Sequence, residues 1–78
     1  MRIFFQLRNG KRLEHSCREG ETFAKILEDF LASASAVGVN KTTLRNPPRL
    51  VFDGEVLDLA KQTPKQLDME DEDMLDLQ

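Results

Sequence analysis

The most informative part of the chain is its last third, where residues 49–77 read RLVFDGEVLDLAKQTPKQLDMEDEDMLDL. Apolar and polar residues alternate at its start, with Leu50 and Phe52 on one face, and this pattern indicates a half-buried β-strand. Asp53 and Gly54 both tolerate the positive φ that a two-residue hairpin turn requires. The three residues that follow are therefore expected to return as a second strand.

The remainder of this stretch predicts a turn, an acidic segment and a final strand. Thr63 and Pro64 indicate a tight turn or a short helix. Leu75 and Leu77 occupy alternating positions, which predicts a last strand with both side chains on one face. Between the turn and this strand lie five carboxylates, here called the acidic cluster: Asp68, Glu70, Asp71, Glu72 and Asp73.

Length and composition limit the class of protein. The chain has 78 residues, of which 40% are hydrophobic and 32% charged, and this predicts one small globular domain over residues 1–78. With one cysteine, Cys17, and one histidine, His15, the chain cannot form an internal disulfide or a cysteine-based zinc site, so no metal or cofactor is expected. No apolar run approaches about 18 residues, and no signal-peptide pattern is present. We therefore expect an intracellular protein, nuclear or cytoplasmic.

Charge is distributed unevenly along the chain. Residues 1–45 hold eight Lys or Arg and five Asp or Glu, a balance of +3, whereas residues 46–78 hold three and nine, a balance of −6. A surface of that acidic density attracts a basic protein surface and repels phosphate backbones and anionic lipid. We expect a protein partner, and neither nucleic acid nor membrane.

The first part of the chain predicts a hairpin. Residues 1–7 alternate as a strand does, and Asn9 and Gly10 form the strongest short hairpin signal, because both central positions of a type I′ turn need positive φ. The return strand is predicted over residues 12–17. Three of its residues are expected to face inward: Leu13, His15 and Cys17.

A helix is predicted to begin after Thr22, which can cap it. Gly38 is a natural stop for this helix, and the polar connector, residues 32–48, ends in two prolines that force an extended approach to the next strand. The i, i+3, i+4, i+7, i+8, i+11 spacing of one buried helical face is met by six residues: Phe23, Ile26, Leu27, Phe30, Leu31 and Ala34.

The elements follow the order hairpin, helix, strand, hairpin return, short turn and strand. This ββαββ order plus a short helical turn indicates an α+β fold in which one helix packs across a mixed sheet, the β-grasp order. The whole chain resembles the ubiquitin superfamily, although its connector is longer than in ubiquitin. TPKxL at residues 63–67 and MExED at residues 69–73 resemble SUMO. The chain resembles in particular the SUMO-like domains built into larger genome-maintenance proteins, which implies a part in sumoylation and DNA repair.

No arrangement of residues predicts catalysis or metal binding. His15 and Cys17 lie two positions apart on an inward face and are interpreted as core residues, whereas a catalytic thiol has to be exposed and activated. The acidic cluster lacks the glycine and the ligand spacing of a calcium loop. We therefore expect no enzymatic activity and no small-molecule substrate.

The resemblance implies three surfaces, of which the first is the patch that receptors recognise on ubiquitin. It matches Arg8, Val51, Asp76 and Gln78 in this chain. Only Val51 is apolar, and such a patch needs a contiguous apolar centre. A ubiquitin-like adaptor that targets its host protein to the proteasome is kept as an alternative, and it should depend on Val51.

The second surface is the groove between the second strand and the helix, where SUMO accepts an extended hydrophobic peptide flanked by acids. Arg18 and Lys25 keep the basic character of that groove, and Phe23 and Ile26 match positions in it. Two lysines and a large apolar residue of SUMO are missing, and Asp29 adds a repelling charge. We expect peptide capture to be weak or lost.

The third surface is acidic, and the resemblance implies that it docks without covalent attachment on the SUMO-conjugating enzyme. Asp53 and the acidic cluster are the residues concerned. One alternative is that these acids only keep an edge strand soluble and unpaired. Another is a covalent SUMO-type modifier whose Gly-Gly tail lies beyond Gln78. Phe4, outward on the first strand, is either a separate contact or is shaded by neighbouring side chains.

Overall fold

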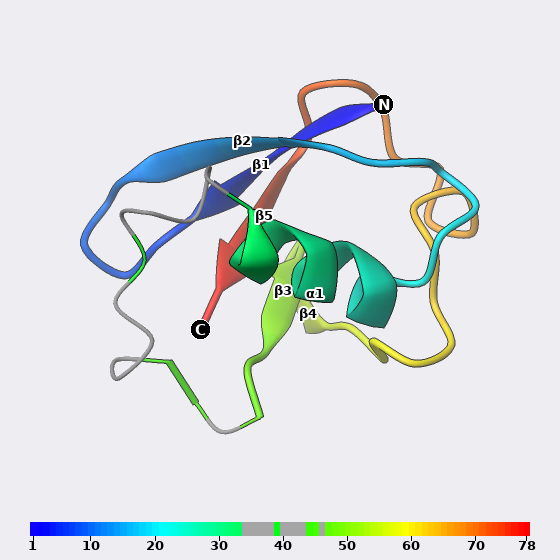
Figure 1. The fold of residues 1–78 in the computed structure, drawn as a ribbon. Coiled ribbons are helices and arrows are strands. Elements are labelled where there is room, and N and C mark those ends of the chain that lie inside the picture. The colour runs from blue at the N-terminus through cyan, green and yellow to red at the C-terminus, as the bar shows by residue number, and fades with distance from the viewer. Residues whose placement is uncertain (34–38, 40–43, 46) are drawn as a thin grey trace.

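The computed structural model of the chain describes residues 1–33, 39, 44–45 and 47–78 (Figure 1). Five strands and one helix are assigned within these residues, so the order is ββαβββ, with the hairpin return as a strand of its own. The elements are β1 (Arg2–Gln6), β2 (Arg12–Ser16), α1 (Phe23–Ala32), β3 (Leu50–Phe52), β4 (Glu55–Val56) and β5 (Met74–Leu77).

The strands form one mixed sheet in the order β2-β1-β5-β3-β4. β1 and β5 are parallel, with Phe4 opposite Met74, while the other neighbours are antiparallel, with Val51 opposite Asp76 between β3 and β5. This register brings the start of β1, the start of β5 and the end of β3 to the same end of the sheet. The predicted β-grasp α+β fold is confirmed.

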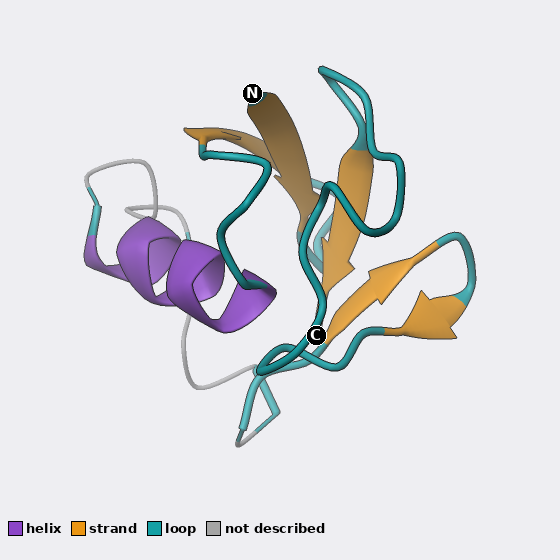
Figure 2. Ribbon diagram, turned by 90° about the vertical axis from the view of Figure 1, so that its right-hand side faces the viewer, coloured by secondary structure: helices purple, strands orange, loops and turns teal. Residues whose placement is uncertain are grey.

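The helix packs against one face of the sheet, as Figure 2 shows. It begins where predicted, because the Thr22 hydroxyl accepts a hydrogen bond from the Lys25 N–H at 3.4 Å and so satisfies one of the free N–H groups at the helix start. The predicted apolar faces of the helix and strands meet in one core. Its buried residues are Ile3, Phe5, Leu7, Phe23, Ile26, Leu27, Phe30, Leu50, Leu57, Met69, Leu75 and Leu77.

The first hairpin turns differently from the prediction. Of its Asn-Gly pair only Gly10 has a positive φ, at 87°. Gly10 N–H donates to the Leu7 carbonyl at 3.0 Å, and Leu7 N–H donates to the Lys11 carbonyl at 2.8 Å. The connection is therefore a three-residue loop with a left-handed glycine at its end, and the predicted type I′ turn is wrong. The Asn9 side chain instead accepts the Lys11 N–H at 3.0 Å.

The helix ends earlier than predicted. Its last residue is Ala32, and Ser33, in an extended conformation, caps it. Both the N–H and the hydroxyl of Ser33 donate to the Phe30 carbonyl, at 3.1 and 2.7 Å, so the end of the helix is closed without a glycine. The predicted positions Ala34 and Gly38 lie outside the described residues.

The turns of the last third agree more closely with the sequence. Asp53 and Gly54 have φ of 54° and 82°, so the predicted hairpin turn with two positive φ values is confirmed. After β4 the chain forms successive tight turns between residues 63 and 68 and no helix. Pro64 is fully buried there and accepts the Met69 N–H at 3.0 Å, which fixes the approach of the chain to the acidic cluster.

Candidate partner-binding surfaces

The acidic cluster curls around the start of β1, where the orange segment passes the N-terminus in Figure 1. The N–H of Arg2 donates to the Asp71 carboxylate at 3.0 Å, and the carbonyl of Arg2 accepts the Glu72 N–H at 2.7 Å. One step along the strand, Phe4 N–H donates to the Asp73 carbonyl at 3.0 Å. These bonds tie the segment to β1.

The cluster also contains its own turn. Glu70 N–H donates to the Asp73 carboxylate at 2.9 Å, and Asp73 N–H donates to the Glu70 carbonyl at 3.2 Å. Asp68 and Glu72 adopt positive φ, 52° and 71°, which glutamate rarely does. The tight path therefore depends on these local bonds and on the contact with β1.

One carboxylate of the acidic cluster, that of Glu72, forms an ion pair with β1. The Arg2 guanidinium hydrogen-bonds to the Glu72 carboxylate and lies 3.5 Å from the Glu14 carboxylate. Attraction first to Glu14 and then to Glu72 raises the pKa of Arg2 above its ordinary value. Together with the bonds to Asp71 and Asp73, this pairing engages three of the predicted partner-binding carboxylates in contacts within the domain, although Asp71 and Glu72 are exposed.

The other predicted acids are exposed. Asp53, Asp68 and Glu70 all lie at the surface, and none of their carboxylates pairs with another side chain in the part of the chain that the structure describes. Asp53 lies in the β3–β4 turn. Because β3 runs antiparallel to β5, this turn faces the end of the sheet at which β5 begins. The fold thus gathers the predicted acids at one end of the sheet, where the exposed carboxylates of Asp68, Glu70 and Asp53 make no side-chain contact in the described part of the chain.

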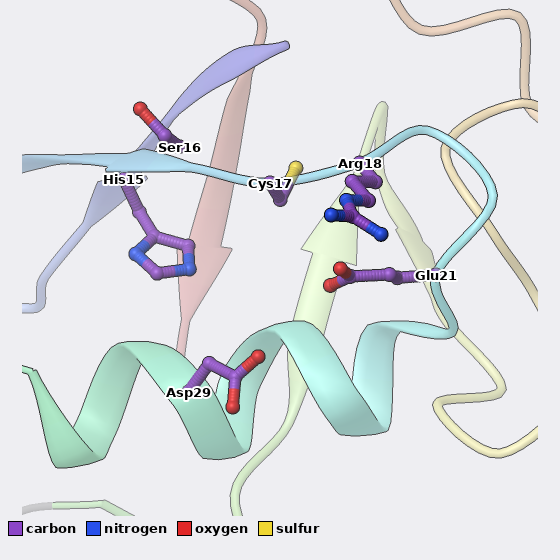
Figure 3. Close-up of a pocket in the computed structure, with 6 residues that line it drawn as sticks. All are labelled: His15, Ser16, Cys17, Arg18, Glu21 and Asp29. Atoms are coloured by element: carbon purple, nitrogen blue, oxygen red, sulfur yellow. The ribbon is translucent and has the colours of Figure 1, made fainter.

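The predicted peptide groove lies beside the edge strand β2 and the helix (Figure 3). Of the predicted residues Arg18 lines it, and exposed Lys25 is paired with Asp29 at 3.1 Å. Phe23 and Ile26 have no exposed surface, which places them in the core beneath the groove and not on its lining. The hollow has a volume of about 320 Å³ and is lined by His15, Ser16, Cys17, Arg18, Glu21 and Asp29.

The chemistry of this groove differs from that of a hydrophobic-peptide site. Glu21, which was not predicted from the sequence, also lines the hollow, and its carboxylate points toward the Arg18 guanidinium in Figure 3. The His15 ring packs edge-on against Phe30 at 5.5 Å between centroids, and its burial lowers the pKa of His15 while Asp29 and Glu21 oppose that shift. The groove offers charged walls and half-buried polar groups in place of open apolar pockets.

The inward placement of Cys17 is confirmed in part, because its side chain is half-buried next to the core. Burial raises the pKa of the Cys17 thiol. A raised pKa lowers the thiolate fraction at neutral pH, which is the opposite of what a nucleophilic cysteine needs. Within the described residues, no group of three or more His, Cys, Asp or Glu side chains is arranged to hold a metal ion.

The outer face of the sheet, opposite the helix, carries the remaining predicted positions. Arg8, Asp76 and Gln78 border a small hollow of about 140 Å³, and Val51 is half-buried between Asp76 and Val56. The residues at the positions that match the ubiquitin patch are therefore mostly polar.

Phe4 is also half-buried on this outer face. It lines a larger hollow, of about 390 Å³, with Arg12, Glu72 and Met74. Met74 was not predicted from the sequence as a surface residue. The signal was present, since Leu75 and Leu77 facing inward require Met74 and Asp76 to face outward.

Comparison with known proteins agrees with this architecture. Among the described residues no helix has the length and apolarity needed to cross a bilayer. A search of curated proteins found no match. The model of a family described as ubiquitin-2 like Rad60 SUMO-like matches residues 1–78. Domains of this family are generally non-catalytic, and SUMO-like domains generally mediate protein–protein interactions. Because the match spans all 78 residues and the fold is a β-grasp, the chain belongs to the Rad60 SUMO-like family of ubiquitin-like domains.

Proposed function

We propose that this domain is a non-catalytic interaction module that docks through Asp53 and the acidic cluster on a basic protein surface. The SUMO-conjugating enzyme is the partner we favour, because the acidic positions match those through which SUMO docks on it. In this proposal the domain recruits or regulates sumoylation in genome maintenance, in the nucleus or the cytoplasm.

One observation carries the proposal, namely the gathering of the acids at one end of the sheet. Asp68 and Glu70 are exposed there, and the turn that contains Asp53 faces the same end. A fixed array of like charges steers an oppositely charged surface toward it and sets the orientation of the complex. The alternative, that the acids only keep an edge strand soluble, fits less well, because β5 lies inside the sheet between β1 and β3.

The hydrogen bonds within the acidic cluster determine which of its acids can be substituted without disturbing its fold. Reversing the charge of Glu72 would set a cation against Arg2, and changing Asp73 would remove the acceptor of the Glu70 N–H. Either variant would disturb the cluster itself. Glu70→Lys leaves these bonds in place, because only the backbone of Glu70 takes part in them.

The experiment is an amide chemical-shift titration of the domain with the SUMO-conjugating enzyme, followed by affinity measurements over a range of salt concentrations. We expect shifts around residues 68–76 and Asp53, and an affinity that falls about three- to tenfold with Glu70→Lys at low salt. Glu28→Lys is the matched control, since it makes the same change in net charge at an exposed position of the helix. Equal effects of the two variants, or no shifts at high enzyme excess, would contradict the proposal.

A further inference from the structure

The outer sheet face holds an apolar hollow that touches the acidic cluster. Phe4 on β1 and Met74 on β5 are paired across the parallel strands and line it, with Arg12 at one border and Glu72 at the other. Its volume is about 390 Å³. Among the described residues the exposed large apolar side chains are Val56 and Met74, and Met74, in a strand inside the sheet, is 38% exposed.

We propose that this hollow receives an apolar side chain that projects from the basic surface of the same partner that contacts the acidic cluster. The interface would then consist of an apolar centre, Phe4 and Met74, with the acidic cluster along one border. This inference rests on the proposed function, because it adds an anchor to that docking surface.

Energetics give the first reason. Exposed ion pairs contribute little to affinity, commonly about 0–1 kcal/mol each, and act mainly on association rate and orientation. Most of the binding energy of an interface comes from a few apolar or aromatic anchors that fill a desolvated pocket near its centre. An acidic surface alone therefore makes an incomplete docking site, and the Phe4–Met74 hollow supplies what it lacks.

Continuity with the acidic cluster gives the second reason. Glu72 belongs to both, since its carboxylate borders the hollow and pairs with Arg2. The backbone joins them as well, because Phe4 N–H donates to the Asp73 carbonyl at 3.0 Å. Because the two surfaces adjoin, a partner that contacts the acidic cluster also lies against the hollow. The flexible thioether of Met74 can adapt to the side chain that enters.

The charges around the hollow define its occupant further. Arg2 is neutralised by Glu14 and Glu72, whereas the Arg12 side chain, exposed on β2, has no ion-pair partner among the described residues. The complementary surface is therefore basic where it meets the acidic cluster, apolar at its centre, and carries an acceptor such as a carboxylate where it meets Arg12.

The test measures how variants of the 78-residue domain bind the SUMO-conjugating enzyme. It compares variants of the hollow, a control variant at another exposed apolar residue, and Glu70→Lys in the acidic cluster. Met74→Gln preserves length and removes the apolar end, and Phe4→Thr keeps a residue that suits a strand. We expect each to lower the affinity about tenfold with no change in its salt dependence. Val56→Thr is the matched control, since Val56 is 58% exposed on the edge strand β4, and it should change the affinity less than about twofold. Thermal unfolding of each variant checks the fold.

Glu70→Lys separates this inference from the proposed function. If Glu70→Lys weakens binding while Met74→Gln and Phe4→Thr do not, the hollow is no docking site and the acidic docking stands. If Glu70→Lys also has no effect, the proposed function fails and the inference falls with it. If the Phe4 and Met74 variants instead abolish self-association in sedimentation experiments and leave enzyme binding intact, a second copy of the chain occupies the hollow and the inference is overturned.

Discussion

Arg2 and Glu72, at opposite ends of the chain, are joined through both backbone and side chain. The Glu72 N–H donates to the Arg2 carbonyl at 2.7 Å, and the Arg2 guanidinium holds the Glu72 carboxylate. Glu72 has a φ of 71°, a backbone conformation that costs free energy for a residue with a side chain. The first strand thus acts as the template on which the acidic cluster takes its shape.

The variant Arg2→Gln separates the contribution of the side-chain ion pair between Arg2 and Glu72 from that of their backbone hydrogen bond. The backbone bonds remain, and because the Arg2 side chain is exposed and its ion pairs are screened by solvent, losing them should lower the free energy of unfolding only slightly. The domain also becomes more acidic where the partner docks, so the affinity for the SUMO-conjugating enzyme at low salt should rise. Urea unfolding and binding titrations measure the two effects. Lys11→Gln, the same charge change in the β1–β2 loop, should leave the affinity nearly unchanged, and a loss of affinity in Arg2→Gln would contradict this account.

The β3–β4 turn gives a prediction about stability. Gly54 has a φ of 82°, where a Cβ atom is strained even though the space around it is open. Gly54→Ala should therefore lower the free energy of unfolding by about 1–2 kcal/mol. Gly20→Ala is the control, because Gly20 lies outside the left-handed region and a Cβ there also meets nothing within 4 Å. Thermal or urea unfolding measures both, and equal losses of stability would refute the assignment of the effect to backbone strain.

Sequence patterns predicted the elements well where periodicity and local chemistry agree. The apolar alternation at Leu75 and Leu77 and the helical spacing from Phe23 to Phe30 both reappear as buried faces. The turn type of the first hairpin was predicted wrongly because Asn-Gly suits two turn types, and the choice between them depends on the pairing of Leu7 with Lys11. The end of the helix was predicted wrongly because the prediction relied on a glycine as the stop signal. Ser33 instead closes the helix through its own hydrogen bonds to the Phe30 carbonyl.

The composition of the acidic cluster was predictable from the sequence, whereas the contacts that its members make within the domain were not. Its members follow from the sequence, since a run of carboxylates before the last strand is visible there. The division between acids whose carboxylates hold the loop and acids whose carboxylates make no such contact depends on Arg2, which is far away in the chain. For the same reason the Phe4–Met74 hollow was missed, because the parallel pairing of β1 with β5 places these two residues together.

The aromatic contact in the core yields a graded prediction. Phe30 and Phe5 are fully buried, and their ring centroids lie 4.3 Å apart. Phe30→Ala should cost about 3–5 kcal/mol, which approaches the total stability of so small a domain, about 4–12 kcal/mol. Phe30→Leu should cost less because most of the volume remains. The exposed residue Val56, changed to Ala, should cost under about 0.5 kcal/mol. Urea denaturation ranks the three, and an equal cost for Val56→Ala and Phe30→Ala would contradict the assigned core.

His15 gives the prediction that depends on pH. Burial between β2 and the helix lowers the pKa of His15 below 6.5, and the carboxylates of Asp29 and Glu21 only partly oppose this. Because the unfolded chain then binds a proton more readily than the folded domain, stability should fall as the pH drops through 6.5 toward the folded pKa, and it should be fully retained above 6.5. His15→Gln should remove this part of the pH dependence.

Two measurements check the His15 prediction. His15 is the only histidine, so its imidazole signals can be titrated by NMR without assignment ambiguity, and the midpoint should lie below 6.5. Urea unfolding at about pH 7.5 and about pH 5.5, where carboxylates titrate little, should show a larger loss of stability in the parent than in His15→Gln. A midpoint at or above 6.5 would contradict the prediction, and a midpoint above 6.5 would mean that Asp29 and Glu21 outweigh burial. The parent would then gain stability relative to the variant at the lower pH, because an imidazolium in the groove would be held by its two carboxylates.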